Sequence, residues 1–303
     1  MLLENGYNNI KNKKDKISIK FKDLMKWRIL FLAFEKELIT ILIVNWNSSD
    51  FVRLNLYALN KLMNLRYKVI ICNNFYSYTE DIKIKKVIKE YNNIELIDRI
   101  QSKMGSIGHG EALDILIKKV DTEYFVILDA DNVFLYPGWD KLLIEEMENK
   151  SIAIYGTQAS TSKTNKSKAT DFPFMFGMIV NTKIFKSLNI SMIPNKKYDT
   201  GGMMKEKYIA KGYKHRMLLY MSTRDSLNPV FKDIICAEYY HPLYHDRLIC
   251  SHFGRGSSQG KAKYSKGIKK YLYLGFPFIL TIKFEKEKNA WIKKCMNLID
   301  SKS

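Results

Sequence analysis

Two apolar runs that end in polar residues constrain the fold of this chain most strongly. Residues 39–47 read ITILIVNWN, and residues 124–134 read YFVILDADNVF. A continuous run of β-branched and other apolar residues is typical of a strand that is buried on both faces of a sheet. Both runs therefore predict strands of a parallel sheet, whose carboxyl ends face a ligand crevice.

The segments around these runs predict helices and further strands in alternation. Residues 50–65 have apolar residues at helical spacing, and residues 67–74 (YKVIICNN) indicate a second buried strand. The pattern repeats with a helix at 84–93, a strand at 94–100 and a helix at 108–120. This order predicts a doubly wound α/β fold with a mixed, mostly parallel sheet, flanked by helices in a single main domain.

The remaining segments complete three expected parts of the chain. Residues 151–160 predict a strand, and residues 172–185 predict a strand followed by a helix. The polar residues 160–170 between them suit either a mobile loop or a solvated linker. A helix is also expected at residues 22–38. The expected parts are a basic N-terminal extension (1–37), the α/β domain (38–258) and a basic, aromatic tail (259–303).

Composition narrows the partners and the compartment. The 303 residues include 50 Lys and Arg against 31 Asp and Glu, a formal charge of +19. This excess favours anionic partners such as nucleic acid, acidic lipid or phosphorylated substrates, although a solvated surface explains part of it. The four cysteines lack Cys-x-x-Cys pairing, and the N-terminus has no apolar signal segment. A cytoplasmic protein without a zinc ribbon or a disulfide framework is expected.

The acidic turn after the second run carries the clearest chemical signal. Asp129 and Asp131 flank Ala130 where the predicted strand stops. Two carboxylates in this arrangement can converge on a hard divalent cation that is also held by diphosphate oxygens. An exposed turn can carry two aspartates without any function. The position after a buried strand, in a chain that opens with a β-α-β unit, favours the metal site.

With these segments in place, the chain resembles glycosyltransferase family 2, the inverting group with the GT-A fold, from about Thr40 to Ser258. The resemblance implies contacts to a nucleotide sugar from Val44, Asn45, Asn47, Asn73, Gly108, Gly110, Asp129 and Ala130. The two glycines also suit a plain turn from loop to helix. The family usually has an acidic residue where Cys72 stands, and a thiol is a poor hydrogen-bond acceptor, so the nucleobase stays open.

The resemblance also implies the catalytic and metal-binding groups. Asp199, before a glycine pair and a helix, takes the role of the base near the acceptor, and a helix N-cap is the alternative. His252 joins Asp131 and Asp129 as a ligand of Mn²⁺ or Mg²⁺, and Arg255 contacts a phosphate. The expected reaction moves a sugar from a nucleoside diphosphate to a hydroxyl of a surface glycan or a lipid-linked glycan, with inversion.

Other interpretations stay open on the sequence. A basic module for acidic membrane or nucleic acid fits the charge, but the lysines are dispersed and no nucleic-acid signature occurs, so no nucleic acid partner is expected. A sugar nucleotidyltransferase would share the acidic turn, but residues 45–55 lack its Gly-rich loop. A catalytically inactive relative would explain Cys72. His241 and His245 have the spacing of a zinc pair on a helix, which Pro242 disfavours.

The tail leaves one further choice. Residues 271–284 (YLYLGFPFILTIKF) are too few for a spanning helix and include a proline and a lysine. The tail therefore either packs on the domain or makes a peripheral contact with the inner face of a membrane, where a lipid-linked acceptor would lie.

Overall fold

The computed structural model describes residues 37–101, 103–159, 171–256, 263 and 277–302. The polar stretch 160–170, the helix expected at 22–38 up to residue 36, and most of residues 257–276 lie outside the described residues. Leu38–Ser303 form one compact unit.

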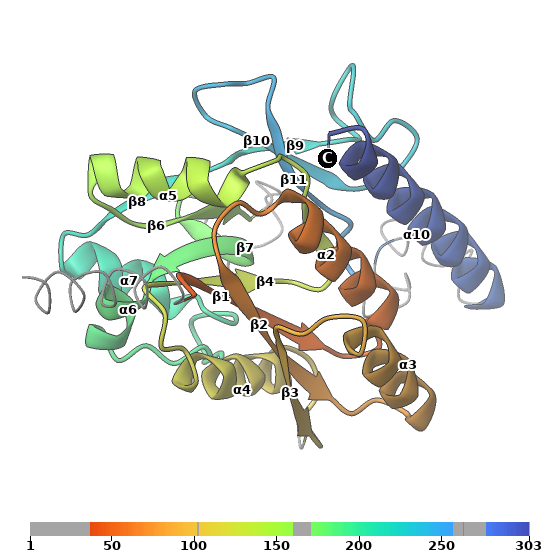
Figure 1. Cartoon of the computed structure of the whole chain (residues 1–303), viewed down its shortest axis with the longest axis horizontal. Coiled ribbons are helices and arrows are strands. Elements are labelled where there is room, and N and C mark those ends of the chain that lie inside the picture. The colour runs from red at the N-terminus through yellow and green to blue at the C-terminus, as the bar shows by residue number, and fades with distance from the viewer. Residues whose placement is uncertain (1–36, 102, 160–170, 257–262, 264–276, 303) are drawn as a thin grey trace, which may run out of the picture. The chain divides into compact units, whose positions relative to one another are not determined.

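A seven-stranded sheet forms the centre of this unit (Figure 1), in the order β3-β2-β1-β4-β7-β6-β8. The strands are β1 Ile39–Asn45, β2 Tyr67–Asn74, β3 Ile94–Arg99, β4 Tyr124–Leu128, β6 Ile152–Gln158, β7 Pro173–Asn181 and β8 Lys214–Met217. Strands β1 to β4 run parallel, whereas β7 is antiparallel to both β4 and β6. The predicted mixed, mostly parallel sheet is confirmed.

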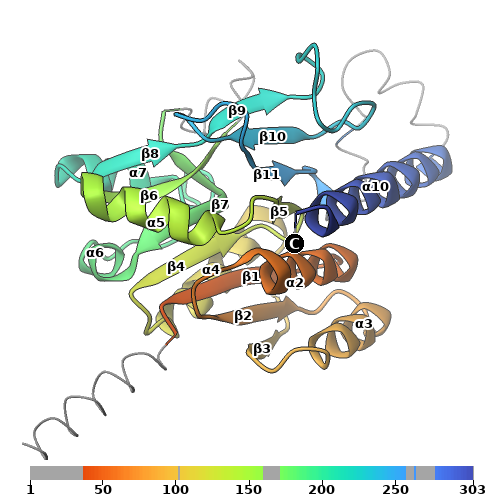
Figure 2. The ribbon, with the colours of Figure 1, turned by 45° about the horizontal axis from the view of Figure 1, so that its top comes forward.

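Helices cover both faces of this sheet (Figure 2). They are α2 Ser49–Leu62, α3 Tyr78–Ile88, α4 Gly105–Lys118, α5 Trp139–Lys150, α6 Thr182–Ser187, α7 Met203–Ala210 and α10 Pro277–Asp300. The first apolar cluster joins the sheet to α2, α3, α5 and α10, and the second joins it to α4, α6 and α7. Ile41 and Ile43 of β1 face the first cluster, and Leu42 between them faces the second. Burial on both faces explains the unbroken apolar run.

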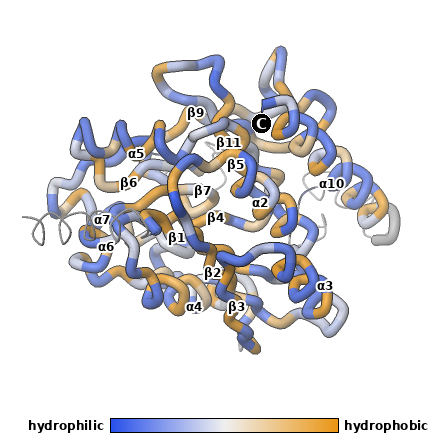
Figure 3. Tube along the Cα trace, in the orientation of Figure 1, coloured by the Kyte–Doolittle hydropathy of each residue, from blue (hydrophilic) through white to orange (hydrophobic). Residues whose placement is uncertain are grey.

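Apolar residues are concentrated on the central strands, as the hydropathy colours show (Figure 3). The bounds of α2, α3 and α4 differ from the predictions at both ends, and each of these helices begins and ends earlier than predicted. Helix α3 begins at Tyr78 rather than residue 84, because Ser77 accepts a hydrogen bond from the Glu80 N–H and caps the first turn. Helix α4 begins at Gly105 rather than residue 108.

A smaller antiparallel sheet stands beside the large one, in the order β5-β11-β10-β9. Its strands are β5 Asn132–Phe134, β9 Leu219–Ser222, β10 Ala237–Tyr240 and β11 Leu248–His252. Strand β5 follows β4 after only three residues, and β11 pairs with β5 so that His252 lies opposite Asn132. The acidic turn therefore joins the two sheets, with the end of β11 beside it.

Helix α10 was not predicted, although its buried residues follow a helical spacing. Leu280, Phe284, Trp291, Cys295 and Ile299 are buried against the first cluster, and the helix contacts α2. Mixed lysines and aromatics in the sequence hide this stripe, because the outer face of the helix carries the charge. No described helix is long and apolar enough to cross a membrane.

Truncation of Trp291 to alanine should destabilise the whole unit. The indole is fully buried, packs on Phe51 and Phe253, and donates from Nε1 to Ser251 Oγ at 3.0 Å. We expect a loss of about 3–5 kcal/mol in the free energy of unfolding, measured by urea denaturation. The exposed Lys294, on the same helix, is the control, and its alanine variant should change stability by less than about 0.5 kcal/mol. A Trp291→Ala loss no larger than that of the control would contradict the observed packing.

Candidate functional site

The acidic turn is held by two elements that are distant from it in the sequence, β7 and α2. The Asp129 N–H donates to the Phe176 carbonyl in β7 at 2.9 Å, and the Asn132 N–H donates back to the Asp129 carbonyl at 3.0 Å. Asn55 of α2 donates from Nδ2 to the Ala130 carbonyl at 2.8 Å. The turn therefore has little freedom, because its peptide groups bond to packed elements on two sides.

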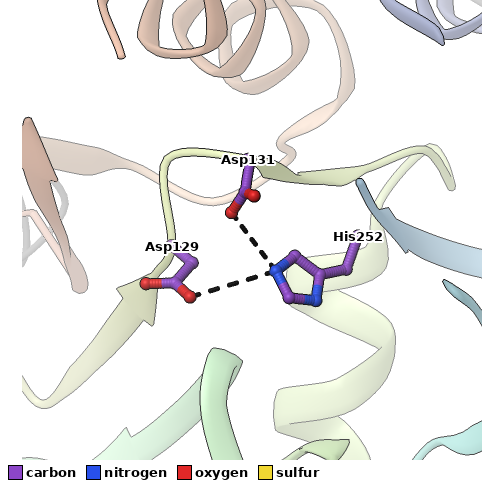
Figure 4. A group of neighbouring side chains, drawn as sticks. All are labelled: Asp129, Asp131 and His252. Atoms are coloured by element: carbon purple, nitrogen blue, oxygen red, sulfur yellow. Dashed lines mark hydrogen bonds and ion pairs between the residues drawn. The ribbon is translucent and has the colours of Figure 1, made fainter. Parts of the chain in front are cut away.

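The side chains of Asp129, Asp131 and His252 converge at this turn (Figure 4). His252 Nε2 lies 3.2 Å from Asp131 Oδ1 and 4.0 Å from Asp129 Oδ2. One donor atom from each residue lies within 4.8 Å of the others. The His252 ring also packs on Phe176, with 4.1 Å between ring centroids. The structure thus brings together the three residues that the sequence predicted as metal ligands.

Asp131 is the more buried of the two aspartates, with 8% of its surface exposed. Its burial acts to raise its pKa, but the charge and hydrogen bond of His252 and the Gly256 N–H hold that pKa below its usual value. The Gly256 N–H donates to Asp131 Oδ2 at 2.7 Å. Asp131 is therefore a carboxylate at neutral pH, the form that binds cations.

Gly256 was missed in the sequence analysis, and its small size matters here. A Cβ atom at this position would lie 2.9 Å from Asp131 Oδ2 and 2.8 Å from Phe51 Cε2. Both distances are shorter than carbon contacts allow. Glycine thus permits the backbone to approach Asp131 closely enough to donate its hydrogen bond.

His109 is a second residue that the sequence analysis passed over. Its Nε2 lies 3.7 Å from Asp129 Oδ1, and its side chain is 28% exposed. Desolvation lowers the pKa of His109 to about 4, although the negative charges of Asp131 and Asp199 act to raise it. The imidazole is therefore neutral at neutral pH.

The neighbouring glycines, expected to admit a nucleotide, have close protein neighbours. A Cβ atom at Gly108 would lie 2.2 Å from the Lys103 carbonyl oxygen. At Gly110 it would lie 2.6 Å from the Met192 carbonyl oxygen and 2.7 Å from Ile193 Cα. Both glycines therefore let the backbone of α4 approach other residues of the chain closely.

Polar residues form a row across the carboxyl ends of β1, β2 and β3. Asn45, Asn73 and Asp98 occupy paired positions, so their side chains lie on one face of the sheet. Asn45 donates to Asn73 Oδ1 at 3.0 Å, and Asn73 donates to Asp98 and Asp81 at 2.9 Å each. Asn45 and Asn73 are buried in this row, whereas Asp98 at its end is exposed.

Val44 and Cys72 are paired in register and lie on the opposite face of the sheet from this row. Cys72 is fully buried in the second apolar cluster, and burial raises the pKa of its thiol to about 11. Its sulfur lies 3.6 Å from Asn74 Oδ1. The thiol is therefore uncharged and enclosed in the position where the family usually has an acidic residue.

Asn47 and Arg255 lie in turns with positive φ. Asn47 follows β1 and has a φ of 53°. The ring centroids of its neighbour Trp46 and of Tyr76 lie 5.0 Å apart. Arg255 has φ 66° and is exposed, one residue before Gly256. Asparagine tolerates the left-handed region well, whereas arginine rarely adopts it.

Asp199 lies in the loop that leads to α7. It is not the N-cap of that helix, because the N-cap is Gly202. Its carboxylate accepts from the Thr200 N–H at 2.9 Å, and Thr200 Oγ1 donates to the Ser106 carbonyl in α4 at 2.9 Å. The loop is therefore tied to the first turn of the helix that carries His109.

His241 and His245 do not form a helical pair. They lie in the turn between β10 and β11, where His241 is buried and its Nδ1 accepts from the N–H groups of Leu243 and Tyr244. His245 is exposed and bonds to the Pro242 carbonyl. The spacing of four residues between the two histidines therefore reflects this turn and not a helix.

Comparison with known proteins identifies the family. The model of Glycosyl transferase family 2 matches residues 40–205. The chain belongs to this family. Among curated individual proteins, none matches the chain.

Solved structures of three proteins are similar to this chain at low sequence identity. The mannosyltransferase PcManGT from Pyrobaculum calidifontis, in complex with GDP-Man and Mn²⁺, is 12% identical over 60% of this chain and 55% of its own, with a TM-score of 0.49. TarS from S. aureus (residues 1–349) is 13% identical over 59% and 57%, with a TM-score of 0.45. Glucosyl-3-phosphoglycerate synthase from Mycobacterium tuberculosis, in complex with phosphoglyceric acid, is 10% identical over 61% and 71%, with a TM-score of 0.45. The family 2 chain thus spans just over half of the first two proteins.

Substitution of Gly256 by alanine should disturb Asp131 without unfolding the protein. The new methyl group would displace the backbone or the carboxylate, and we expect Mn²⁺ affinity to fall by about tenfold or more in a calorimetric titration. Gly212→Ala is the control, because a Cβ atom there meets nothing within 4 Å, although its φ of +70° costs some stability. Equal Mn²⁺ affinity in the two variants would show that the close approach at Gly256 has no role in the site.

Proposed function

We propose that this family 2 member transfers a sugar from a nucleoside-diphosphate donor to a hydroxyl acceptor, with inversion and with a divalent metal. The convergence of Asp129, Asp131 and His252 at the carboxyl edge of the parallel strands supports this proposal most directly. Ligands of open α/β sheets bind outside the carboxyl ends of the strands, where the order of strands reverses. Here β1 and β4 are neighbours at that reversal.

The donor set of the proposed metal site fits Mn²⁺ or Mg²⁺. Two carboxylates supply hard oxygen ligands, and the nitrogen of His252 favours Mn²⁺ over Mg²⁺, because Mg²⁺ prefers oxygen ligands. When bound, such an ion would offset the negative charge that develops on the departing diphosphate. The described contacts of Asp131 keep its carboxylate ionised and oriented for this role.

The nucleotide would extend from the metal site along the ends of the parallel strands. Neighbouring strands lie about 4.8 Å apart, so the end of β2 lies about 10 Å from that of β4. Val44, Asn45, Asn47 and Asn73 would contact the nucleoside along this path. Gly108, Gly110, Asp129 and Ala130 would border the nucleotide sugar, with Arg255 as a phosphate contact through its guanidinium.

Asp199 would act as the base for the acceptor. The negative charges of Asp199 and Asp131 both act to raise the pKa of His109, so both carboxylates lie near that ring. Removal of the proton from the acceptor hydroxyl strengthens the nucleophile as it attacks the anomeric carbon. Attack opposite the leaving diphosphate inverts that carbon. A surface glycan or a lipid-linked glycan is the proposed acceptor.

The two proposed roles predict different losses. Asp131→Ala should abolish the metal-dependent binding of a nucleoside diphosphate in calorimetry, because its carboxylate is the best-held metal ligand. Asp199→Asn should bind the same nucleotide with unchanged affinity, because that residue serves the acceptor. Its turnover should fall by about 10²–10⁴-fold, the usual contribution of a general base.

The wild-type protein provides the reference for this test. It should bind one nucleoside diphosphate from a panel of bases more tightly with Mn²⁺ than without it. No binding of any nucleotide would favour an inactive relative instead. Release of pyrophosphate rather than nucleoside diphosphate would indicate a nucleotidyltransferase.

We extend the proposal to a peripheral contact with the inner face of a membrane, through α10. Its outward face carries the exposed lysines Lys286, Lys293 and Lys294. The apolar side chains of Ile282 and Met296 are also exposed there. Lysines beside apolar residues on one face of a helix suit an anionic lipid surface, with about 1 kcal/mol per lysine near it.

Reversal of these charges should release the protein from acidic vesicles. We expect the triple lysine-to-glutamate variant at 286, 293 and 294 to lose binding to phosphatidylserine vesicles in a flotation assay. The matched control changes the exposed Lys196, Lys207 and Lys211 in the same way. Equal loss in both variants would mean that net charge alone, and no particular face, governs binding.

A further inference from the structure

The carboxylate of Asp129 lies between two imidazole rings. Its Oδ2 lies 4.0 Å from His252 Nε2, on the side of the candidate metal site. Its Oδ1 lies 3.7 Å from His109 Nε2, on the other side. The two oxygens of one carboxylate thus face two different histidines, only one of which belongs to the cluster of potential metal ligands.

The backbone around His109 is held in place by close contacts. Gly108 and Gly110, on either side of it, lie so close to Lys103 and Met192 that neither could carry a side chain. Arg99 donates from Nη1 to the Gly108 carbonyl at 3.0 Å and forms an ion pair with Glu111. These contacts hold the start of α4 in position between the end of β3 and the loop before Asp199.

We propose that His109 is a positioning residue for Asp129, a role that rests on the proposed metal-dependent function. Its Nε2–H donates to Asp129 Oδ1 when the carboxylate turns toward it, so that Oδ2 stays directed at the metal site. The last torsion of an aspartate is soft, so a small rotation closes the gap from 3.7 Å to a hydrogen bond. Groups that orient a metal ligand in this way typically change metal affinity by about 10–100-fold.

Both side chains of this pair are partly exposed. His109 is 28% exposed and Asp129 is 18% exposed, so neither needs the other to satisfy a deeply buried charge. A contact of this kind contributes little to folding, because solvent can replace it. Its contribution should therefore appear in metal binding and leave stability nearly unchanged.

The test measures Mn²⁺ affinity of the full chain without nucleotide, by the electron paramagnetic resonance signal of free Mn²⁺. His109→Ala should weaken binding by about 10–100-fold. His109→Gln should restore most of the affinity, because its Nε2 lies the same number of bonds from Cα as the Nε2 of histidine. His109→Asn should not restore it, since its amide ends one bond short. His245→Ala, at the exposed turn between β10 and β11, is the control and should bind as the wild type does.

The outcomes separate this inference from the function on which it rests. If wild-type protein binds Mn²⁺ and His109→Ala binds it equally well, the positioning role is wrong and the metal site stands. If His109→Ala loses affinity and thermal stability together, or if His109→Gln restores nothing, the positioning role is also wrong. If the wild type and an Asp131→Ala variant both fail to bind Mn²⁺, the metal assignment fails, and this inference fails with it.

Discussion

The short passage from β4 to β5 is the constraint on which the site depends. Only Asp129, Ala130 and Asp131 separate β4 of the large sheet from β5 of the small one. Such a passage leaves no room for a loop, so the turn must satisfy its peptide groups with neighbouring elements, and it does so through Phe176 and Asn55. The two carboxylates consequently lie at a defined place where the sheets meet.

The second sheet serves chiefly to bring distant residues to this turn. Pairing of β11 with β5 carries His252 across more than a hundred residues of sequence to within 3.2 Å of Asp131. The chain then turns so that the Gly256 N–H reaches the other oxygen of the same carboxylate. Helix α10 supports this arrangement from behind, because Trp291 packs on Phe253 and donates to Ser251 within and beside β11. The contacts that hold α10 in place therefore also support β11, the strand that carries His252.

Electrostatics and packing divide the site into two regions. Around Asp131, burial acts to raise the pKa of the carboxyl group, and His252, the Gly256 N–H and the charge of Lys263 lower that pKa and keep the group charged. At the ends of β1 to β3, by contrast, the buried amides of Asn45 and Asn73 bond to each other and to Asp98, which is exposed. The first region is the one where we propose the metal and the diphosphate to bind, and the second is the one where we propose the nucleoside to bind.

The sequence by itself determined the alternation of strands and helices from Ile39 to Leu128 and the presence of Asp129 and Asp131 after a buried strand. Strong local signals carried these predictions, because a strand buried on both faces must be apolar throughout. The resemblance to glycosyltransferase family 2 added His252. The tertiary structure alone decided the positions of His109, Gly256 and α10. Each depends on a contact between residues far apart in the chain: a ring beside a carboxylate, a backbone N–H near an oxygen, and an apolar stripe hidden among lysines. No local pattern encodes such contacts, because they form only when separate elements pack together.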